Sequence, residues 1–319
     1  MSRAGQLPSA NNLINFEQII NAYYALEPSA SDPAQKVVFG TSGHRGAAEK
    51  TSFNQAHIVA ITAAIVEYRK NQGLGGAILV GFDTHLLSLP AFKSCLEVLA
   101  AAEVDFSVDT HVREDLIELA LQGEAPEGCA IWTPTPAVSH AILRANANKT
   151  GDSELSDAII ITPSHNPPTD GGIKYNPPHG GPAGSETTNW IANRANELLA
   201  NWQSIPRRSF DEALAKANRV DFRNDYVQDL ANVIDMPAIK QAGLRICADS
   251  LGGASIDYWS EIAKVYGLNL TVANPVVDPA FRFITLDWDE KIRMDCSSAN
   301  SMAGTVEKAN TSNDFDLFT

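Results

Sequence analysis

The chain has 319 residues, of which 44% are hydrophobic, so it is long enough and apolar enough for two packed domains. Its formal net charge is −14, which argues against nucleic acid and anionic membranes as partners, because both bind positive surfaces. The polar residues 1–12 lack the apolar core of a secretory signal, and no segment approaches the length of a membrane span, so we expect a soluble cytoplasmic protein.

Helical and strand patterns alternate along the first half of the chain. A helical repeat of apolar residues covers 13–26, and a second helix is predicted from a cap at Ser52 or Asn54 through residue 70. Two further helices are predicted over residues 90–102 and 137–146. Short apolar runs predict strands at residues 36–40, 77–80, 104–108, 128–132 and 158–161. Such alternation is typical of a mixed or parallel α/β sheet.

The second half repeats the alternation after two helical segments. Those segments cover residues 190–202 and 206–220, and a second α/β unit starts near residue 225. Its predicted elements are helices at 226–233, 255–266 and 298–308 and strands at 244–248, 269–272, 292–295 and 315–318. We therefore expect two domains, residues 1–205 and 206–319.

The most informative segment follows the predicted strand at 158–161. Residues 161–182 read ITPSHNPPTDGGIKYNPPHGGP, which places Ser164 in a loop at the carboxyl end of a buried strand. Open α/β sheets bind their ligands at this edge. A serine hydroxyl is a weak nucleophile by itself, and an ordinary loop serine is the alternative interpretation.

Three neighbours of Ser164 are candidates for the same site. Lys174 lies ten positions further on, across an expected Gly171-Gly172 turn, and a lysine there can act as a cation or take a proton. His165 and Asn166 can orient a phosphate. A solvated lysine is the alternative for Lys174, and turn formation is the alternative for Asn166, which precedes a proline.

A second polar loop lies near the N-terminus. Residues 41–46 read TSGHRG, in which Arg45 offers forked donors suited to a phosphate and the glycines allow close backbone approach. Ser42 and His44 are weaker candidates for contact with the same phosphate. A glycine-rich loop with one arginine is common. This loop therefore indicates a phosphate site only in combination with the Ser164 segment.

Together, the two loops resemble the active-site segments of the α-D-phosphohexomutase family, in particular the phosphoglucomutases that act on α-D-glucose phosphates. The resemblance implies two consecutive α/β/α-layered domains with mixed sheets. It also implies that Ser164 carries a phosphoryl group, that Arg45 faces this group, and that Lys174, assisted by His165, handles protons. Ser42, His44 and Asn166 are then expected to bind substrate phosphate.

The activity implied by the resemblance interconverts glucose 1-phosphate and glucose 6-phosphate. Glucose 1,6-bisphosphate is the expected intermediate and activator, and a hexose phosphate is the expected small-molecule partner. Mg²⁺ is the expected cofactor, with Ser164 contributing a ligand through its phosphoryl group. The remaining metal ligands are expected beyond Thr319, because the family's aspartate loop would begin just after it. The oligomeric state is left open by the sequence.

Other interpretations stay open at this stage. The chain could be a truncated, non-catalytic fragment or a sugar-phosphate-binding module, and the sugar could be mannose or glucosamine. Asp83 and His85 also resemble the family sequence, and a structural role is expected for them. Asp287 and Asp289 are expected to be exposed turn residues, and Glu290 replaces the glycine that is usual in the family at that turn.

Overall fold

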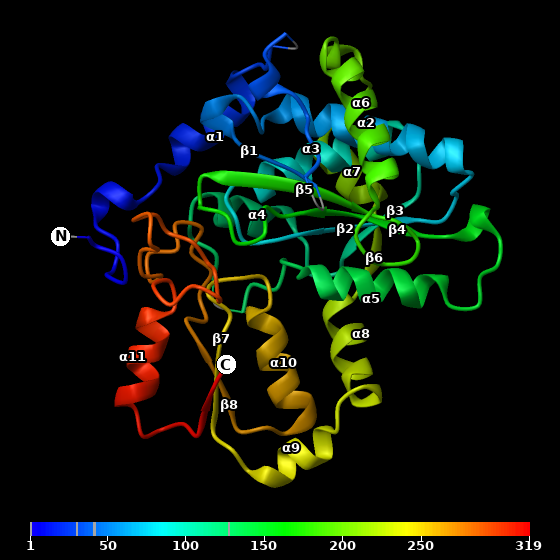
Figure 1. The fold of residues 1–319 in the computed structure, drawn as a ribbon. Helices are drawn as coiled ribbons and strands as arrows, with labels where there is room; N and C mark the ends of the chain where they lie inside the picture. The colour runs from blue at the N-terminus through cyan, green and yellow to red at the C-terminus, as the bar shows by residue number, and fades with distance from the viewer. Residues whose placement is uncertain (1, 30, 41–42, 127) are drawn as a thin grey trace.

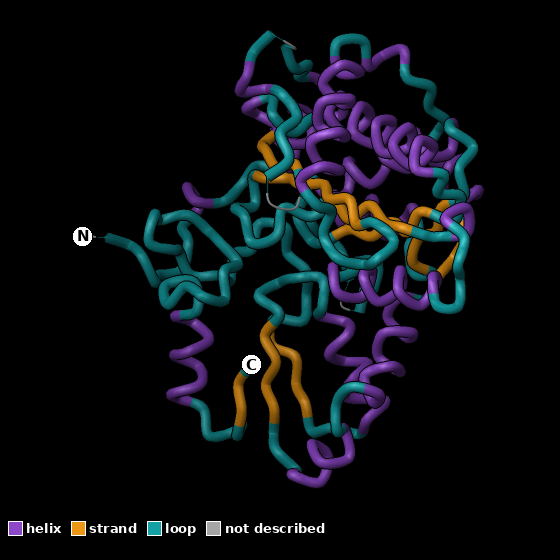
Figure 2. The backbone as a smooth tube through the Cα atoms, turned by 45° about the vertical axis from the view of Figure 1, so that its right-hand side comes forward, coloured by secondary structure: helices purple, strands orange, loops and turns teal. Residues whose placement is uncertain are grey.

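The computed structural model describes residues 2–29, 31–40, 43–126 and 128–319 (Figure 1). Its strands form two separate sheets, one of six strands and one of three. Helices pack around both sheets, and loops connect the two parts of the molecule (Figure 2). The expected α/β class with a mixed sheet is therefore confirmed.

The larger sheet is mixed, with strand order β1-β5-β4-β2-β3-β6. β5 runs antiparallel to both of its neighbours, whereas β4, β2, β3 and β6 are parallel to one another. The strands are β1 (His44–Ala47), β2 (Ile78–Phe82), β3 (Phe106–Asp109), β4 (Asp157–Ile161), β5 (Asp170–Asn176) and β6 (Asn218–Val220).

Helices cover both faces of this sheet, which explains why its central strands are apolar throughout. Ile159 packs into the core on the side of α2, α3 and α6, and Ile160 packs with α5 on the opposite side (Figure 1). A strand buried on both faces needs apolar residues at every position rather than at alternate ones. The helices of this part are α1 (Phe16–Ala25), α2 (Gln55–Gln72), α3 (Ser88–Ala101), α4 (Glu114–Leu121), α5 (Thr135–Asn146), α6 (Ser185–Leu199) and α7 (Phe210–Lys216).

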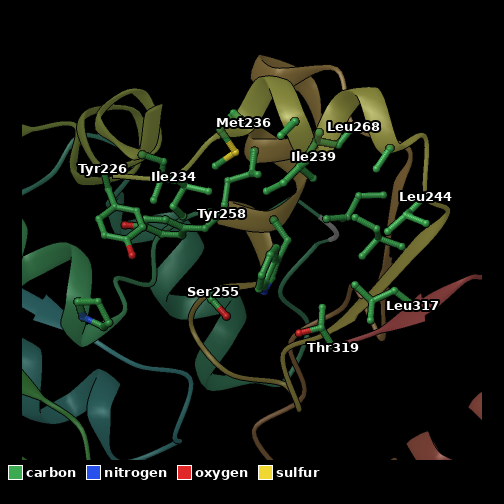
Figure 3. Close-up of a pocket in the computed structure, with 18 of the residues that line it drawn as sticks. Tyr226, Ile234, Met236, Ile239, Leu244, Ser255, Tyr258, Leu268, Leu317 and Thr319 are labelled. Carbon is green, nitrogen blue, oxygen red and sulfur yellow. The ribbon is translucent and has the colours of Figure 1, made fainter. Parts of the chain in front are cut away.

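The smaller sheet is parallel, with strand order β8-β7-β9. Its strands are β7 (Ile246–Asp249), β8 (Leu270–Ala273) and β9 (Leu317–Phe318), and its helices are α8 (Phe222–Asp229), α9 (Met236–Ala242), α10 (Ile256–Tyr266) and α11 (Ala303–Thr311). An apolar groove of about 680 Å³ lies between this sheet, α9 and α10 (Figure 3). Leu270, Ile246 and Leu317 are paired across the three strands and all line it.

Several predicted elements are wrong, and the errors concern short segments. Residues 36–40 and 292–295 form single bridges instead of strands, between Phe39 and His44 and between Leu286 and Ile292. Residues 128–132 belong to no strand, and helix α4 was not predicted. Short apolar runs do not by themselves distinguish extended loops from strands.

The Gly171-Gly172 turn is also wrong, because both glycines lie inside β5. The chain turns earlier, where the Asp170 N–H donates to the Pro167 carbonyl oxygen. Glycine is usually depleted from strands, but a Cβ at Gly171 would lie 2.3 Å from the Phe53 ring. Close packing against the strand therefore requires glycine here.

The division after residue 205 stays a prediction. Helix α7 and strand β6 extend the first part of the fold to Val220, with β6 paired to β3 in the larger sheet. Among the described residues, no helix combines the length and the apolar character needed to cross a membrane.

Candidate active site

Ser164 lies just past the end of β4, with its side chain exposed. Its φ is +72°, the left-handed region that residues with a Cβ rarely adopt. The Ser164 N–H donates to Thr162 Oγ1 at 2.9 Å. Backbone strain of this kind persists only where the surrounding contacts hold it, and it is common at functional sites.

Gly172 allows β5 to pack against the Ser164 loop. The Thr162 N–H donates to the Gly172 carbonyl oxygen at 2.8 Å. A Cβ on Gly172 would lie 2.3 Å from the Thr162 carbonyl oxygen and 2.6 Å from Pro163 Cα. Since both atoms belong to the backbone, the loop takes this position only with glycine at 172.

Arg45 and Lys174 come to this loop from the neighbouring strands β1 and β5. Arg45 is paired with Gly172, and Lys174 lies two residues further along β5, on the same face. Gly43 allows the Lys174 side chain to pack closely against the backbone of residue 43, because a Cβ there would lie 2.8 Å from Lys174 Cγ. Burial and the nearby Arg45 charge lower the pKa of Lys174, while Asp83 opposes the shift. The structure thus brings the two predicted cations together.

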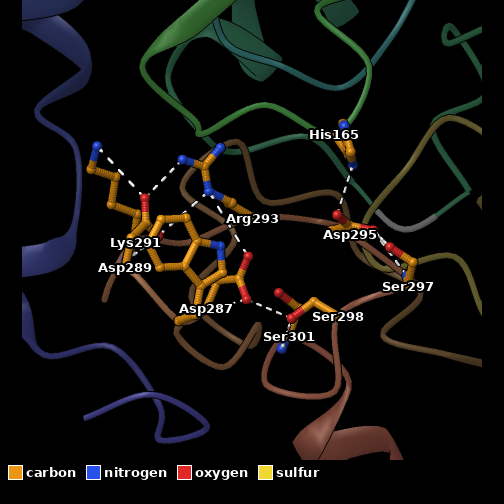
Figure 4. A network of polar contacts seen from close by, with 10 residues as sticks. His165, Asp287, Asp289, Lys291, Arg293, Asp295, Ser297, Ser298 and Ser301 are labelled. Atoms are coloured by element: carbon orange, nitrogen blue, oxygen red, sulfur yellow. Dashed lines mark hydrogen bonds and ion pairs between the residues drawn. The ribbon is translucent and has the colours of Figure 1, made fainter. Parts of the chain in front are cut away.

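His165 and Asn166 are each tied to a carboxylate. His165 Nδ1 lies 3.2 Å from Asp295 Oδ2, a contact that joins the Ser164 loop to a distant segment (Figure 4). Asn166 Nδ2 donates to Asp170 Oδ2 at 2.9 Å. The sequence analysis missed Asp295 because nothing in its local pattern indicates a contact with residue 165.

His44 and Ser42 differ from the other candidates. His44 is buried, with Nε2 2.8 Å from the Ser52 carbonyl oxygen and Nδ1 3.3 Å from the backbone of Val38. A direct contact between His44 and a phosphate requires the loss of one of these contacts, and its predicted role stays a prediction. Ser42 lies outside the described residues.

A cleft of about 530 Å³ opens beside Ser164 and His165. The larger-sheet part of the chain contributes these two residues together with Asp83 and Thr133. The opposite wall comes from the second part, and its side chains mix hydroxyls with apolar groups: Ser250, Ser255, Phe281, Met294 and Cys296. Its size suits a small ligand such as a sugar phosphate.

The acidic segment near the cleft is more buried than expected. Asp287 is only 2% exposed and accepts a hydrogen bond from Ser298 Oγ, so it is not an exposed turn residue (Figure 4). Asp289 is half-buried and accepts from Arg293 Nη2 at 2.8 Å. Glu290 follows in the left-handed region, with φ +59°.

Three carboxylates lie around the Ser164 loop, and Mg²⁺ prefers oxygen ligands of this kind. Asp83 accepts from two hydroxyls and a histidine, Asp170 from Asn166 and Thr169, and Asp295 from His165 and Ser297. Each of the three is thus already engaged by protein donors. Among the described residues they do not form a ready ligand set for Mg²⁺.

A second acidic group lies outside this cleft. Asp109, His111 and Asp221 bring ligand atoms within 4.8 Å of one another. Arg223 Nη2 lies 3.0 Å from His111 Nε2, and Asp109 Oδ1 lies 2.7 Å from His111 Nδ1. An arginine thus already supplies positive charge there, and both ring nitrogens are engaged.

Comparison with known proteins identifies the family of this chain. Residues 36–201 match the family described as "Phosphoglucomutase/phosphomannomutase, alpha/beta/alpha domain I". The chain belongs to this phosphoglucomutase/phosphomannomutase family. The matched range includes Arg45, Ser164 and Lys174, and the predicted family resemblance is confirmed.

Similar proteins carry names that belong to the same family. A phosphoglucomutase of Komagataeibacter xylinus is 46% identical over 306 residues, which cover 95% of this chain and 52% of that protein. Phosphoglucomutase 1 of Saccharomyces cerevisiae is 32% identical over 149 residues, covering 40% of this chain and 25% of that protein. The chain thus spans about half the length of the first relative and less of the second.

Solved structures of other proteins share the fold of this chain. The open form of Paramecium parafusin, a phosphoglucomutase, matches with a TM-score of 0.63 at 19% identity, over 90% of this chain and 50% of that one. A phosphoglucomutase/phosphomannomutase family protein of Burkholderia thailandensis matches with a TM-score of 0.52 at 20% identity, over 80% of this chain and 46% of that one. At these identities the likeness concerns the fold alone.

Proposed function

We propose that this protein interconverts α-D-glucose 1-phosphate and glucose 6-phosphate through a phosphoserine at Ser164. One observation carries the proposal: Ser164 is exposed and has a left-handed backbone conformation. Its loop packs against the strands that bear Arg45 and Lys174. The 46% identity to a protein named phosphoglucomutase supports the glucose sugar. A cytoplasmic location stays a prediction.

The proposed reaction has two transfers. In the first, O6 of glucose 1-phosphate attacks the phosphorus of phosphorylated Ser164; the Oγ–P bond breaks and the O6–P bond forms, giving glucose 1,6-bisphosphate. In the second, Ser164 Oγ attacks the phosphorus of the 1-phosphate; the O1–P bond breaks and the Oγ–P bond forms, which regenerates phosphoserine and releases glucose 6-phosphate. In each transfer the attacking hydroxyl gives up one proton and the leaving oxygen takes one up. Such transfers depend mainly on positioning and on the neutralisation of charge.

The two cations have distinct proposed roles. Arg45 is exposed and contributes forked donors to the phosphoryl oxygens. Lys174 takes the proton of the attacking hydroxyl, and its lowered pKa increases the fraction that is neutral and able to do so. His165 and Asn166 orient the phosphate. His44 and Ser42 are proposed to make weaker contacts with the same phosphate.

Two small-molecule requirements belong to the proposal. Glucose 1,6-bisphosphate phosphorylates Ser164 and so starts the cycle. Mg²⁺ is proposed as the cofactor that offsets phosphate charge when bound, with the phosphoryl group on Ser164 as one ligand. No step is assigned to the metal, because the described carboxylates near Ser164 are already engaged.

The test measures phosphate uptake and turnover separately. The 319-residue chain is incubated with glucose 1,6-bisphosphate and Mg²⁺; intact mass and peptide mapping locate the phosphate, and a coupled assay follows glucose 6-phosphate. Ser164→Ala is expected to abolish uptake and to lower turnover about 10³-fold or more. Ser153→Ala, at an exposed serine in the short 3-10 helix that precedes β4, is the control and leaves both unchanged. Phosphate uptake by Ser164→Ala at wild-type level contradicts the proposal.

A second candidate is a sugar-phosphate-binding module without catalysis. The engaged carboxylates near Ser164 favour it, because they leave a bound phosphate without a preformed metal set. Calorimetric binding of glucose 1-phosphate without phosphate uptake at Ser164 identifies this case. The relatives named phosphoglucosamine mutase, 29% identical for example in Prochlorococcus marinus, make glucosamine 1-phosphate the competing sugar to compare, together with mannose 1-phosphate.

A further inference from the structure

Just past the end of β2, the buried His85 and the mostly buried Asp83 form an ion pair that contacts the Ser164 loop. Asp83 Oδ2 lies 2.9 Å from His85 Nδ1, and the His85 side chain is 3% exposed. On its other side, His85 Nε2 lies 2.9 Å from the Asn166 carbonyl oxygen. A carboxylate and a carbonyl oxygen only accept hydrogen bonds, so both ring nitrogens of His85 must donate, which requires the charged imidazolium.

The groups facing this ring support the charge. Burial opposes it, but Asp83 and its hydrogen bond, with smaller help from Asp170, leave the pKa of His85 raised. Burial alone would raise the pKa of Asp83, but His85, Ser88 and Thr162 outweigh it, so this pKa is lowered. The Phe281 ring, 5.3 Å away, covers His85 from the second part of the chain.

Thr162 connects this pair to Ser164. Thr162 Oγ1 donates to Asp83 Oδ2 at 2.6 Å and accepts the Ser164 N–H at 2.9 Å. The same hydroxyl thus joins the Asp83 carboxylate to the backbone of Ser164. On the other side of the loop, His85 holds the carbonyl of Asn166. Both flanks of the Ser164–His165 segment are therefore fixed from one buried pair.

We propose that Asp83, His85 and Thr162 form a positioning unit that holds Ser164 in its left-handed conformation, with His85 as an imidazolium bridging Asp83 and Asn166. These three are positioning residues, since they act through the backbone of the loop. The effect of the unit on catalysis rests on the function proposed for Ser164. The geometry of the unit is independent of that function. Without it, the strained conformation at Ser164 relaxes and the hydroxyl leaves the orientation that phosphoryl transfer needs.

The test compares Thr162→Val with Thr162→Ser. Valine matches the shape of threonine but has no hydroxyl, and serine keeps the hydroxyl. Amide hydrogen exchange at Ser164 is expected to accelerate about tenfold in Thr162→Val and to stay near the wild-type rate in Thr162→Ser. Amides of β4 and α5 report whether the fold is intact. Equal Ser164 exchange in both variants and wild type overturns the proposal.

Two further measurements keep the result decisive. Imidazole ¹⁵N resonances of the wild-type protein, assigned with His85→Gln, are expected to show both His85 nitrogens protonated at neutral pH; a neutral ring overturns the proposal even if Thr162→Val does not fold. The rate of Ser164 phosphorylation by glucose 1,6-bisphosphate is expected to fall in Thr162→Val with little change in the half-saturating concentration, and to recover in Thr162→Ser. Absence of phosphorylation in wild type defeats the proposed function alone, because amide exchange and imidazole protonation still decide the positioning unit.

Discussion

Arg45 and Lys174 are diagonal neighbours on the antiparallel pair β1–β5, so two cations share one face of the sheet next to the Ser164 loop. Like charges at this spacing repel, and the repulsion is part of the reason that the pKa of Lys174 is low. In a chain with a net charge of −14, the pair offers an anion local attraction against the overall field.

The first prediction concerns this repulsion. Arg45→Met is expected to raise the pKa of Lys174 while leaving the contribution of burial in place. Because the folded pKa is lowered, the unfolded state binds more protons between that pKa and the ordinary lysine value, so stability rises with pH across this window. Arg45→Met should flatten that rise. NMR titration of the Lys174 side chain and urea unfolding against pH measure both effects; an unchanged Lys174 titration contradicts the prediction.

The second prediction concerns Gly172. Gly172→Ala brings its Cβ to 2.3 Å from the Thr162 carbonyl oxygen, and backbone cannot move aside as a flexible side chain does. We expect a loss of about 1–3 kcal/mol of unfolding free energy, by analogy with overpacking, and displacement of the Ser164 loop. Thermal and urea unfolding measure the loss.

Gly304→Ala is the matched control for Gly172→Ala. Gly304 lies in α11, and a Cβ there makes only an ordinary contact at 3.7 Å with Thr285. Because Gly304 is the second residue of the helix, alanine there should change the unfolding free energy by about 0.5 kcal/mol or less. If both alanine variants change stability equally, close packing at Gly172 is not the cause.

The third prediction concerns a buried ion pair that supports β4. Arg69 Nε donates to Asp157 Oδ2 at 2.8 Å, and the Tyr175 hydroxyl donates to the same oxygen at 2.6 Å. Burial raises the pKa of Asp157 even with Arg69 present. Arg69→Met leaves this carboxylate without a positive partner, and we expect a loss of about 3–5 kcal/mol by denaturant unfolding.

Arg194→Met supplies the comparison. The Arg194–Glu67 pair has side chains 34% and 42% exposed, so the same substitution should cost about 1 kcal/mol or less. Arg194 also pairs with Glu197 at 2.7 Å, so its substitution removes two exposed ion pairs, whereas Arg69→Met removes one buried pair. Similar losses in the two variants would contradict the larger cost expected of the buried pair.

The sequence predicted best where one local pattern determines the outcome. The apolar run at 158–161 is strand β4, and Ser164 follows it as expected, because a strand buried on both faces has an unmistakable composition. The contribution of Thr162 and Asp295 was not predictable, since each depends on a partner brought close only by tertiary packing. The Gly171-Gly172 error has the same origin, because packing against Phe53 and the Thr162 backbone overrides the local preference of glycine.

The last prediction concerns Glu290, a residue with a side chain at a turn where the family resemblance predicts glycine. Its φ of +59° places a Cβ in the left-handed region, where side chains are disfavoured by about 1–2 kcal/mol. Its carboxylate accepts from Ser2 Oγ and the Arg3 N–H, both at 3.2 Å, and these contacts are exposed. Glu290→Gly relieves the strain and loses the contacts, whereas Glu290→Ala loses the contacts alone. The glycine variant should therefore unfold with a free energy about 1 kcal/mol above that of the alanine variant. Equal stability of the two variants in urea would show that the turn does not hold residue 290 in the left-handed region.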